Sequence, residues 1–551
     1  MATIYTGVES AWYLPGIYVN VDLGRGTPSA AALSRRVLLV GNRLDPDDDM
    51  LDEFYEPCSA SESPRETEIE SEYKDDYKNG YNSETNPIGT DNGKYYRIPS
   101  LRRAAQRFGY GSELYMMAKA AFKANRNVDL WGYVQPEGLF NHAESEIWIS
   151  TLDSDDDDVI QDTKAGVIKI ELLGRKCYVP VKDGEAAWEV AANIANAFNN
   201  QFRDLPYYCD VEGLTGSSSS SFDEFHYGEQ LTFRAKHPGY IYEGVKCTID
   251  VGSTCVTAPA DFTFTGADDD DQYPDLSATV PLGAAFAQDS LLRTERFHYI
   301  VVPYNNDDNI TALATFLSDQ ADPMVGLRQQ GILGSNDDLA AKNSCVNPRV
   351  QMAWAPGHNY FPGELAAAVA GVRQKWEGSD PAVNLCLKPV KGIPMAEDVN
   401  LQTPTIKNEE IGKGITPIVP HEGNMVILRS VTTAVDHSTF PVFDTGKVTV
   451  SDFLADDIEI KMLARYKGFK LSPDTDIPLP SRVTTPSRIR MALLEWLRAA
   501  EAKGIICRVT EMAEQVQVEI DEDVPGRVNF EIPEDVVDIF AVGAGNIIQI
   551  G

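Results

Sequence analysis

The stretch Phe297-His298-Tyr299-Ile300-Val301-Val302-Pro303 decides the fold class, because it is a nearly continuous apolar run of strand length. Such runs are typical of strands that are covered on both faces, as the strands of parallel sheets are. Apolar residues at helical spacing follow in 310–317, a second strand-like run covers 350–354, and an Ala-rich helix is predicted over 363–376. Because strands and helices alternate, we expect a mostly parallel, Rossmann-like sheet.

The residues that precede this stretch supply another part of the same sheet. The run 36–41 (RVLLVG) predicts a buried strand. Residues 45–95 are acidic and rich in Ser, Asn and Gly without an apolar period, so we interpret them as a surface insertion that cannot bury much surface. A Gly109-Tyr110-Gly111-Ser112 turn then leads into a predicted helix over 113–122, whose N-cap is the serine of that turn, and 128–134 predicts the next strand.

A second, smaller module lies between these two parts. Residues 166–172 and 176–181 predict a hairpin, 187–198 an amphipathic helix, and 232–235 and 245–251 further strands. We therefore expect a small inserted α+β domain.

The C-terminal part mixes strands with one long helix. Strands are predicted over 425–429, 430–433, 516–520 and 528–532, and an amphipathic helix over 487–502. We expect these segments to form a further domain.

The chain as a whole is expected to be an α/β and α+β multidomain protein. It would have a Rossmann-like mixed sheet core, an inserted small α+β domain, and extended N- and C-terminal β arms. The expected divisions are an N-terminal arm (1–25), the first part of the α/β domain (26–150, with the acidic insertion 45–95), the inserted α+β domain (151–290), the α/β core (291–420), a C-terminal domain (421–535) and a C-terminal arm (536–551).

Composition excludes several classes of partner. The 551 residues contain 83 Asp and Glu against 48 Lys and Arg, a net charge of −35 that repels phosphate backbones and anionic lipid. No apolar run approaches the roughly 18 residues that a membrane span needs, and the start of the chain lacks the features of a signal peptide. The eight cysteines form no CxxC pair, which argues against a disulfide framework or a zinc ribbon. We expect a soluble, unexported protein with no nucleic-acid partner and no direct membrane insertion.

Motifs for catalysis, cofactor binding and metal binding are missing from the sequence. There is no GxGxxG or GxxxxGK[ST] loop, and the glycines of 109–112 and 543–545 are interpreted as a turn and as part of an arm. The seven histidines are scattered without an HExxH pair, and there is no GxSxG elbow. We therefore expect no catalytic residue, no cofactor and no metal site.

One acidic run has partial calcium-loop spacing. Asp153, Asp155 and Asp157 stand at positions one, three and five of such a loop, but position six is Asp158 and position twelve is Lys164. We interpret the run as a solvated acidic linker, with weak cation binding as the alternative. A melting temperature unchanged by calcium would remove that alternative.

The two apolar, β-prone ends of the chain have no strand partner in their own sequence neighbourhood. An end of this kind exposes unpaired backbone N–H and C=O groups, which proteins usually avoid. Each arm either packs on its own domain or adds a strand to the sheet edge of a neighbouring copy. Exchange of the second kind is heterologous and generates a helix or stacked rings.

Several segments occur in an order that resembles a known family. They are Leu14-Pro15-Gly16-Ile17-Tyr18, Arg36-Val37-Leu38-Leu39-Val40-Gly41, Phe108-Gly109-Tyr110-Gly111-Ser112-Glu113-Leu114, Gly174-Arg175-Lys176, Asp183-Gly184-Glu185-Ala186-Ala187, Lys236-His237-Pro238-Gly239, Tyr299-Ile300-Val301-Val302-Pro303-Tyr304, Arg429-Ser430-Val431-Thr432-Thr433, Tyr466-Lys467, Val483-Thr484-Thr485-Pro486 and Ile489-Arg490. In this order the chain resembles the contractile tail sheath proteins of Mu-like phages over almost its whole length. The insertion 45–95 departs from the family pattern, and we interpret it as a decoration of the outer wall.

This resemblance implies a structural subunit and not an enzyme. Sheath proteins of the family polymerise as stacked hexameric rings around a tail tube, and they contract to drive the tube through the host envelope during genome ejection. The implied partners are other copies of the chain, the tail tube protein, and the baseplate and tail terminator proteins. The implied location is the virion tail, after assembly in the host cytoplasm. The inserted domain would lie outermost and domain 421–535 next to the tube.

The resemblance also implies roles for particular residues. The inter-subunit arms would carry Tyr13, Ile17, Tyr18, Val19, Val21, Ile539, Phe540, Val542, Ile547, Ile548 and Ile550. The tube-facing candidates are Arg488, Arg490 and Arg498 in the helix 487–502, for which an ordinary solvated helix side is the alternative.

Other functions remain open at this point. A sheath of a phage-derived contractile injection particle would use the same physics. An enzyme with a Rossmann-like core is favoured only by the alternation of strands and helices after residue 297. An adhesin-like surface protein built from residues 165–290 is opposed by the missing signal peptide.

Overall fold

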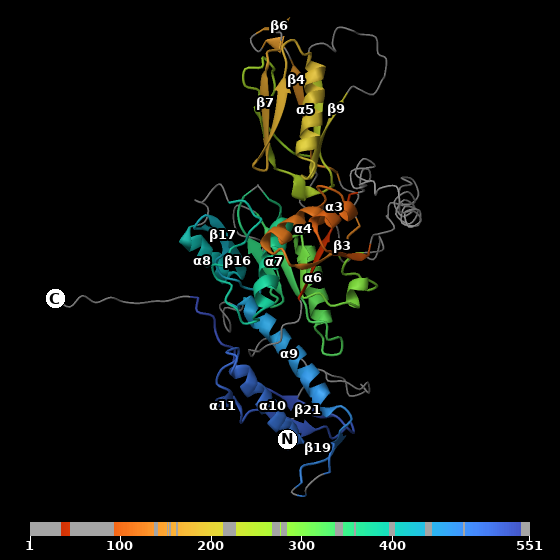
Figure 1. Ribbon diagram of the computed structural model, residues 1–551, viewed down its shortest axis with the longest axis vertical. Coiled ribbons are helices and arrows are strands. Elements are labelled where there is room, and N and C mark those ends of the chain that lie inside the picture. The colour runs from red at the N-terminus through yellow and green to blue at the C-terminus, as the bar shows by residue number, and fades with distance from the viewer. Residues whose placement is uncertain are drawn as a thin grey trace, which may run out of the picture.

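The computed structural model of the chain is elongated, with three parts stacked along its long axis (Figure 1). The structure describes residues 35–44, 93–136, 141–150, 152–153, 156–160, 163–212, 228–266, 276, 284–336, 345–357, 360–395, 403–435, 443–475, 477 and 480–541. Most of the acidic insertion, residues 45–92, therefore lies outside the described residues.

The middle part is built on an eight-stranded mixed sheet, which confirms the predicted sheet core. Its strand order is β17-β16-β15-β14-β13-β1-β3-β2. The bounds are β1 Arg36–Gly41, β2 Tyr95–Ile98, β3 Asp129–Val134, β13 Tyr299–Val302, β14 Gln330–Ser335, β15 Val350–Trp354, β16 Ile415–His421 and β17 Asn424–Ile427. The six central strands are parallel, and the edge strands β2 and β17 are antiparallel to their neighbours.

Helices cover both faces of this sheet and explain why its strands are apolar throughout. Val37 and Leu39 of β1 point into the core formed with α4 (Glu113–Ala124) and α7 (Pro362–Glu377). Leu38 and Val40 point to the other face, into the core formed with α6 (Asp307–Gln320). The remaining helices of this part are α3 (Leu101–Phe108) and α8 (Pro404–Gly412). The predicted helices over 113–122, 310–317 and 363–376 are confirmed as α4, α6 and α7.

The inserted domain, called the outer domain below, surrounds one helix with two sheets. The first sheet has the order β4-β10-β9 and the second β12-β11-β7-β8. The bounds are β4 Glu144–Ser150, β7 Gly166–Leu172, β8 Arg175–Val181, α5 Ala187–Gln201, β9 Tyr207–Glu212, β10 Gly228–Ala235, β11 Lys246–Asp250 and β12 Asp261–Thr263. The predicted hairpin and helix are confirmed as β7–β8 and α5, and β4 joins this domain although it precedes residue 151.

The acidic run 153–158 is not simply a linker, which corrects the sequence interpretation. Residues of this run contribute to β5 (Leu152–Asp153) and β6 (Asp156–Ile160), which pair antiparallel. A register shift between Leu152 and Asp153 accompanies the pairing. Backbone pairing between two short strands therefore involves residues at both ends of this run.

The C-terminal domain hangs from one long helix, α9 (Thr445–Tyr466), which begins beneath the sheet and runs away from it (Figure 1). It continues with β18 (Lys470–Leu471), β19 (Val483–Thr484), α10 (Pro486–Glu501), α11 (Val509–Met512) and the hairpin β20 (Gln517–Ile520) and β21 (Val528–Glu531). The predicted helix 487–502 and the last two predicted strands are confirmed.

The strand predicted over 430–433 is wrong, although the segment is extended. Val431 forms only an isolated bridge with Asp444. The Thr416 hydroxyl accepts a hydrogen bond from the Val431 amide at 3.0 Å and donates one to its carbonyl oxygen at 3.0 Å. A side chain thus occupies the place that a neighbouring strand would take. Within the described part of the chain, no helix is long and apolar enough to cross a membrane.

Candidate functional site

The sheet has one position where a ligand would be expected on topological grounds. From β1 the chain continues to β3 on one side, whereas β13 is followed by β14, β15 and β16 on the other side. Ligands of open α/β sheets bind outside the carboxyl ends of the strands at such a reversal of strand order. The carboxyl ends of β1 and β13 therefore mark the first candidate site.

This position is filled by the side chain of Glu113, the first residue of α4, which is 3% exposed. Its Oε2 accepts hydrogen bonds from the amide of Asn42 at 2.9 Å and from the hydroxyl of Tyr304 at 2.8 Å. Its Oε1 accepts one from the hydroxyl of Tyr242, in the outer domain, at 3.0 Å. Burial and the neighbouring Glu113 raise the pKa of Tyr242 well above its usual value, so that this phenol remains a donor. The carboxylate therefore joins the two domains through its hydrogen bonds to both.

The glycine turn before α4 is a contact between domains. The Ser112 hydroxyl accepts a hydrogen bond from the Tyr115 amide at 3.1 Å, which confirms the predicted N-cap. Gly111 has φ +79°, and a Cβ built there would lie 2.2 Å from the carbonyl oxygen of Leu205 in the outer domain. The Lys236 ammonium, also in the outer domain, donates to the carbonyl oxygen of Tyr110 at 3.2 Å. The glycine turn therefore contacts the outer domain directly, and this contact is compatible with the prediction of a turn at 109–112.

An ion-pair cluster strengthens the same junction. Lys119 of α4 reaches Asp204 of the outer domain at 2.5 Å, and Arg175 binds the same carboxylate. Burial alone would raise the pKa of Asp204, but hydrogen bonds from Lys119 and Arg175 lower it. The carboxylate therefore stays ionised at neutral pH and holds the outer domain against α4.

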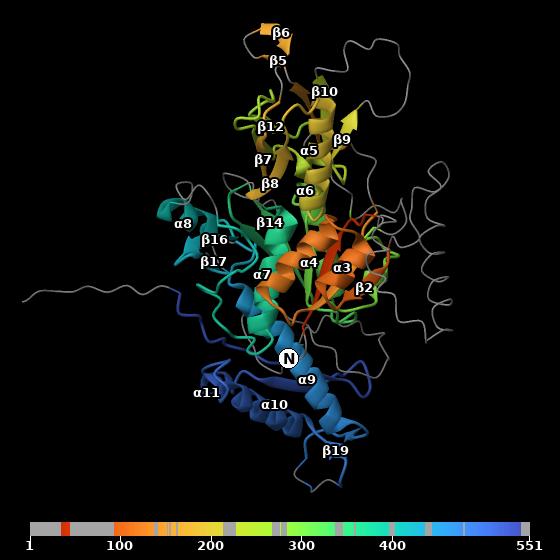
Figure 2. The same ribbon diagram turned by 45° about the horizontal axis from the view of Figure 1, so that its top comes forward.

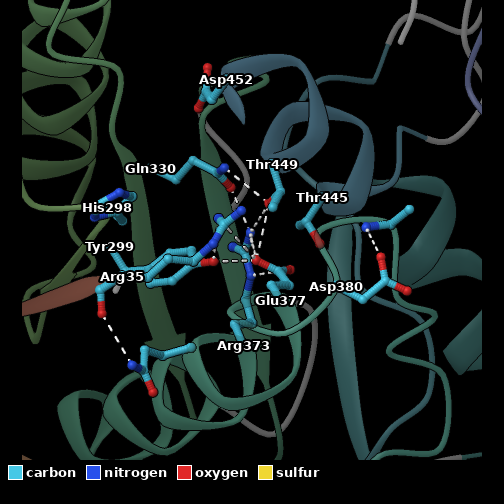
Figure 3. A network of polar contacts seen from close by, with 12 residues as sticks. Arg35, His298, Tyr299, Gln330, Arg373, Glu377, Asp380, Thr445, Thr449 and Asp452 are labelled. Atoms are coloured by element: carbon cyan, nitrogen blue, oxygen red, sulfur yellow. Dashed lines mark hydrogen bonds and ion pairs between the residues drawn. The ribbon is translucent and has the colours of Figure 1, made fainter. Parts of the chain in front are cut away.

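A buried polar network occupies the opposite edge of the sheet, at the amino ends of the parallel strands (Figure 3). Arg373 and Glu377, both in α7 and both at 0–1% exposure, form an ion pair at 3.0 Å. The Glu377 carboxylate also accepts hydrogen bonds from the Tyr299 hydroxyl and, at 3.1 Å, from Thr449 of α9. Arg35 lies 3.9 Å from the same carboxylate. The Glu377 carboxylate is thus the counter-charge of two guanidinium groups, and its hydrogen bonds link α7 to β13 and α9.

The remaining donors of Arg373 bind side chains at the starts of two strands and one side chain of α9. Its guanidinium donates to Gln330 at 2.6 Å, to Gln351 at 3.0 Å and to Thr449 at 3.0 Å. Gln351 in turn donates to Thr416 at 3.0 Å. The network therefore runs across β14, β15 and β16, and its geometry suits a structural connection because its polar groups bind one another.

An acidic stripe on α9 extends this connection. Asp452, Asp456 and Glu459 lie at helical spacing on one face of α9. Arg349 binds Asp452 through two hydrogen bonds of 2.9 Å each. Arg328 binds Asp456 at 3.0 Å and Glu459 at 2.7 Å. Since each of these arginines stands just before a strand, the strand ends of the sheet hold α9 between Asp452 and Glu459.

His298 shows how strongly this edge is charged. Burial and the nearby guanidinium groups of Arg296, Arg35 and Arg36 lower the pKa of His298 to about 2. Its neutral Nδ1 accepts a hydrogen bond from the Arg36 amide at 3.1 Å. The imidazole therefore acts as a fixed acceptor and not as a proton-transfer group near neutral pH.

The hairpin of the C-terminal domain is the second candidate site. Half-buried Val518, Val528 and Phe530 of β20 and β21 pack against the core that α9 and α10 form. Among the described residues, β20 and β21 pair only with each other. Two-stranded sheets are marginal alone, and their outer edges present unpaired backbone groups.

The C-terminal segment runs past this domain along a defined path. Val536 forms a bridge with Ile506, and Asp538 forms an ion pair with Lys447 of α9 at 3.0 Å. The side-chain amide of Asn384 then donates to the carbonyl oxygen of Phe540 at 3.1 Å.

The predicted arm residues are only partly visible. Phe540 is 82% exposed, and Ile539 is half-buried. The other predicted arm residues lie outside the described residues: Tyr13, Ile17, Tyr18, Val19, Val21, Val542, Ile547, Ile548 and Ile550.

The three candidate tube-facing arginines do not share one face of α10. Arg488 and Arg498 are exposed on the same side, with Met491 between them at 71% exposure. Arg490 points elsewhere: its guanidinium donates to the backbone carbonyl oxygens of Val516 at 2.8 Å and of Ala513 at 2.5 Å. Arg490 therefore has a structural partner within its own domain.

Neither the polar network nor the acidic stripe on α9 was predicted from the sequence. One signal for them is present in the sequence: an arginine precedes four of the apolar strands, as in RRVLLV, RFHYIVV, RQQGILG and RVQMAW. Among the described residues, no group of three or more His, Cys, Asp or Glu side chains is placed to hold a metal ion.

No protein-family profile matches the sequence, and no curated protein matches it either. Solved structures do resemble the chain. The sheath tail protein of Desulfitobacterium hafniense shares 11% identity and a TM-score of 0.44, over 95% of this chain and 97% of that chain. The sheath tail protein of Listeria innocua shares 11% identity and a TM-score of 0.42, over 93% of this chain and 94% of that chain.

A third structure is similar over part of the chain. The helical sheath of the anti-feeding prophage in its contracted state shares 16% identity and a TM-score of 0.34, over 53% of this chain and 78% of that chain. All three neighbours are sheath proteins and not enzymes.

Proposed function

We propose that this chain is a structural subunit of a contractile tail sheath. It polymerises as stacked hexameric rings around a tail tube, and contraction of the polymer drives the tube through the host envelope during genome ejection. Other copies of the chain, the tube protein, and the baseplate and terminator proteins are its partners, and the virion tail is its location. The observation that carries this proposal is the two-stranded hairpin β20–β21 of the C-terminal domain. Among the described residues, the outer edges of this hairpin pair with no further strand.

The hairpin suits strand addition by another copy. Its strands present backbone groups at both outer edges while their half-buried side chains already rest on the core beneath. The C-terminal segment of the same copy leaves the domain at Phe540 with its aromatic ring exposed. Arms 1–25 and 536–551 of neighbouring copies would complete the sheet, and main-chain hydrogen bonds would supply the affinity.

Exposed apolar side chains in the C-terminal domain support the same assignment. Met491, Phe540 and Ile477 are each at least 71% exposed. Ile460 and Leu463 of α9 are 58% and 51% exposed. They lie on the same side of the helix that binds the sheet, but closer to the C-terminal end of α9. Apolar groups that remain open to water in one copy are typical of surfaces that another chain covers.

The alternative of an enzyme receives no support from the described residues. The crevice where an open α/β sheet would bind a ligand is filled by Glu113 and its three hydrogen-bond donors. The buried polar network lies at the amino ends of the strands, and its side chains form hydrogen bonds and ion pairs with one another. In a sheath, the work of contraction comes from relaxation of a metastable lattice, which needs no nucleotide.

Removal of the arms tests the proposal. The full chain is expected to form long hollow cylinders in negative-stain electron micrographs, alone or with tube protein. A variant that lacks residues 1–21 and 539–551 is expected to remain as single copies, because the strands that link copies are gone. Circular dichroism serves as the control, since the truncated chain should keep its helix signal. Cylinders from the truncated chain would refute strand exchange, and a full chain that never assembles, even with tube protein, would refute the sheath assignment.

We further propose that the exposed side of α10 faces the tube, through Arg488, Met491 and Arg498. Replacing both arginines by glutamate reverses the charge of this side in a chain that is otherwise strongly acidic. Tube-templated assembly is expected to fall, while tube-free polymerisation continues. Lys470→Glu, an exposed change in the same domain, is the control. Unchanged co-sedimentation with the tube would contradict this orientation.

A further inference from the structure

The surface around α3 is basic in a chain that is otherwise strongly acidic. Figure 2 shows α3 beside α4 and β2, at the margin of the middle part. Residues 93–136, which form these elements and β3, contain eight Lys and Arg against two Asp and Glu, although the whole chain has a net charge of −35. Helix α3 alone has three arginines among its eight residues and no acidic residue. The composition of the chain as a whole therefore does not account for this local charge.

Five side chains make up this surface, called the basic surface below: Arg43, Lys94, Arg102, Arg103 and Arg107. The lysine and the two arginines in the first turn of α3 are exposed, and the other two arginines are half-buried. The Arg107 guanidinium lies 3.8 Å from the ring centre of Tyr96, so the end of α3 lies beside the start of β2. Arg103 and Arg107 are four residues apart and therefore share one side of the helix.

The acidic side chains on the elements packed against α3 are engaged elsewhere. Glu113, the acidic residue of α4, is buried at the carboxyl ends of β1 and β13. Asp129 of β3 binds Arg97 of β2 at 3.1 Å, on the face of the sheet opposite to α3. Asp204 of the outer domain is held by two cations that are not part of the basic surface. The charge of the basic surface thus comes from its five cationic side chains.

The acidic insertion is attached to the chain next to the basic surface at both of its ends. Just before it, the Leu44 amide donates to the Phe108 carbonyl oxygen at the end of α3, at 2.8 Å. Just after it, the Gly93 amide donates to the Val134 carbonyl oxygen of β3 at 3.0 Å. Residues 45–92 contain 16 Asp and Glu against three Lys and Arg, a net charge of −13. A segment of this length reaches all of α3, which is only about 12 Å long, from either attachment.

We propose that residues 45–92 bind the basic surface of the same copy. Opposite net charges supply the attraction, and attachment at both ends gives the segment a local concentration in roughly the millimolar range, which other copies do not reach. The contact keeps the basic surface from binding acidic surfaces of other copies. This inference goes beyond the proposed function, because it concerns a single copy and does not require assembly.

Photo-cross-linking in the full chain tests this contact. A benzoylphenylalanine takes the place of Gln106, a half-buried residue beside the arginines of α3, and mass spectrometry identifies the peptides that it captures. Only links to residues 55–82 count, because these lie ten or more residues from either end of the segment. We expect such links in the chain with all its arginines. At 1 M salt, where the Debye length is about 3 Å, their yield is expected to fall roughly fivefold or more.

Charge reversal of the basic surface is expected to have the same effect as salt. One variant carries Arg102→Glu and Arg103→Glu, and its link yield at low salt is expected to fall roughly fivefold or more. Acidic residues are favourable in the first turn of a helix, so α3 itself is expected to remain folded. The control carries Lys467→Glu and Lys470→Glu, two exposed residues of the C-terminal domain, which change the net charge by the same amount. Its yield is expected to equal that of the unreversed chain.

A mixture of copies with and without ¹⁵N identifies which copy supplies the segment. We expect both peptides of a link to come from copies with the same label. Links mainly between differently labelled copies would assign the basic surface to a second copy and overturn the proposal. The absence of links to 55–82 would overturn it as well.

Yields that respond neither to salt nor to arginine reversal would show that attachment alone, and not charge, keeps the segment near α3, which also contradicts the proposal. Polymerisation is measured separately by electron microscopy. A chain that never assembles, even with tube protein, would refute the sheath assignment and leave this contact within one copy unaffected.

Discussion

Glu377→Gln is expected to lower the free energy of unfolding by about 3–5 kcal/mol, the usual effect of removing one partner of a buried ion pair. The substitution keeps the shape of the side chain but leaves the guanidinium groups of Arg373 and Arg35 buried without their counter-charge. It also weakens the two hydrogen bonds that the hydroxyl groups of Tyr299 and Thr449 donate to this carboxylate in the wild-type chain. Equilibrium unfolding in urea measures the change.

A matched control isolates burial as the cause. Glu295→Gln removes a carboxylate that pairs with Arg36 at 3.0 Å, but this pair is open to solvent, with the glutamate side chain 42% exposed. Its loss is expected to cost about 1 kcal/mol or less. Equal effects of the two substitutions would show that the network at the base of α9 contributes no special stability.

Gly111→Ala is expected to destabilise the chain by about 2–5 kcal/mol and to displace the outer domain. The left-handed backbone conformation alone costs about 1–2 kcal/mol for a residue with a Cβ. The added methyl group would also lie 2.2 Å from the Leu205 carbonyl oxygen, which is a backbone atom and can retreat only if the domain moves. Urea unfolding measures the loss, and increased proteolysis at the junction reports the displacement.

Gly184→Ala provides the comparison, because Gly184 has φ +74° and an added Cβ would meet no other atom within 4 Å. Only the conformational cost of about 1–2 kcal/mol is expected there. If Gly111→Ala cost no more than Gly184→Ala, the close approach of the two domains at the glycine turn would be refuted.

The sheet was predictable because its strands are buried on both faces. A continuous apolar run such as Val37 to Val40 is required when alternate residues enter the α4–α7 core and the α6 core. The helices α4, α6 and α7 show the matching period, so their existence also followed from the sequence.

Helix α9 was not predictable in the same way. Its first turns contain Val448, Thr449 and Val450, β-branched residues that favour strands. Asp452 and Asp456 then occupy buried positions where an amphipathic helix would show apolar side chains. They are tolerated because arginines from distant parts of the chain bind them, and single-sequence periodicity contains no information about such partners.

The features of the candidate sites differ in the same way: some follow from local sequence, and others depend on residues far apart in the chain. The strands β20 and β21 and the helix α10 arise from local patterns, and all three were predicted from the sequence. The internal role of Arg490 depends on carbonyl oxygens more than twenty residues further along the chain, and the filling of the sheet crevice depends on Tyr242 in a separate domain. Both required tertiary structure.

The position of β1 inside the sheet, between β3 and β13, has a consequence for synthesis of the chain. Arg36 and His298, which bring β1 beside β13, are 262 residues apart. At a synthesis rate of roughly 5–20 residues per second, about 13–50 s separate the two strands. The sheet pairings of the outer domain involve only residues between 144 and 265, so that domain can close while β1 still lacks the strand on one of its sides. Among the described strands, β1 is thus made first, yet it gains the neighbour on its second side only after the outer domain has been synthesised.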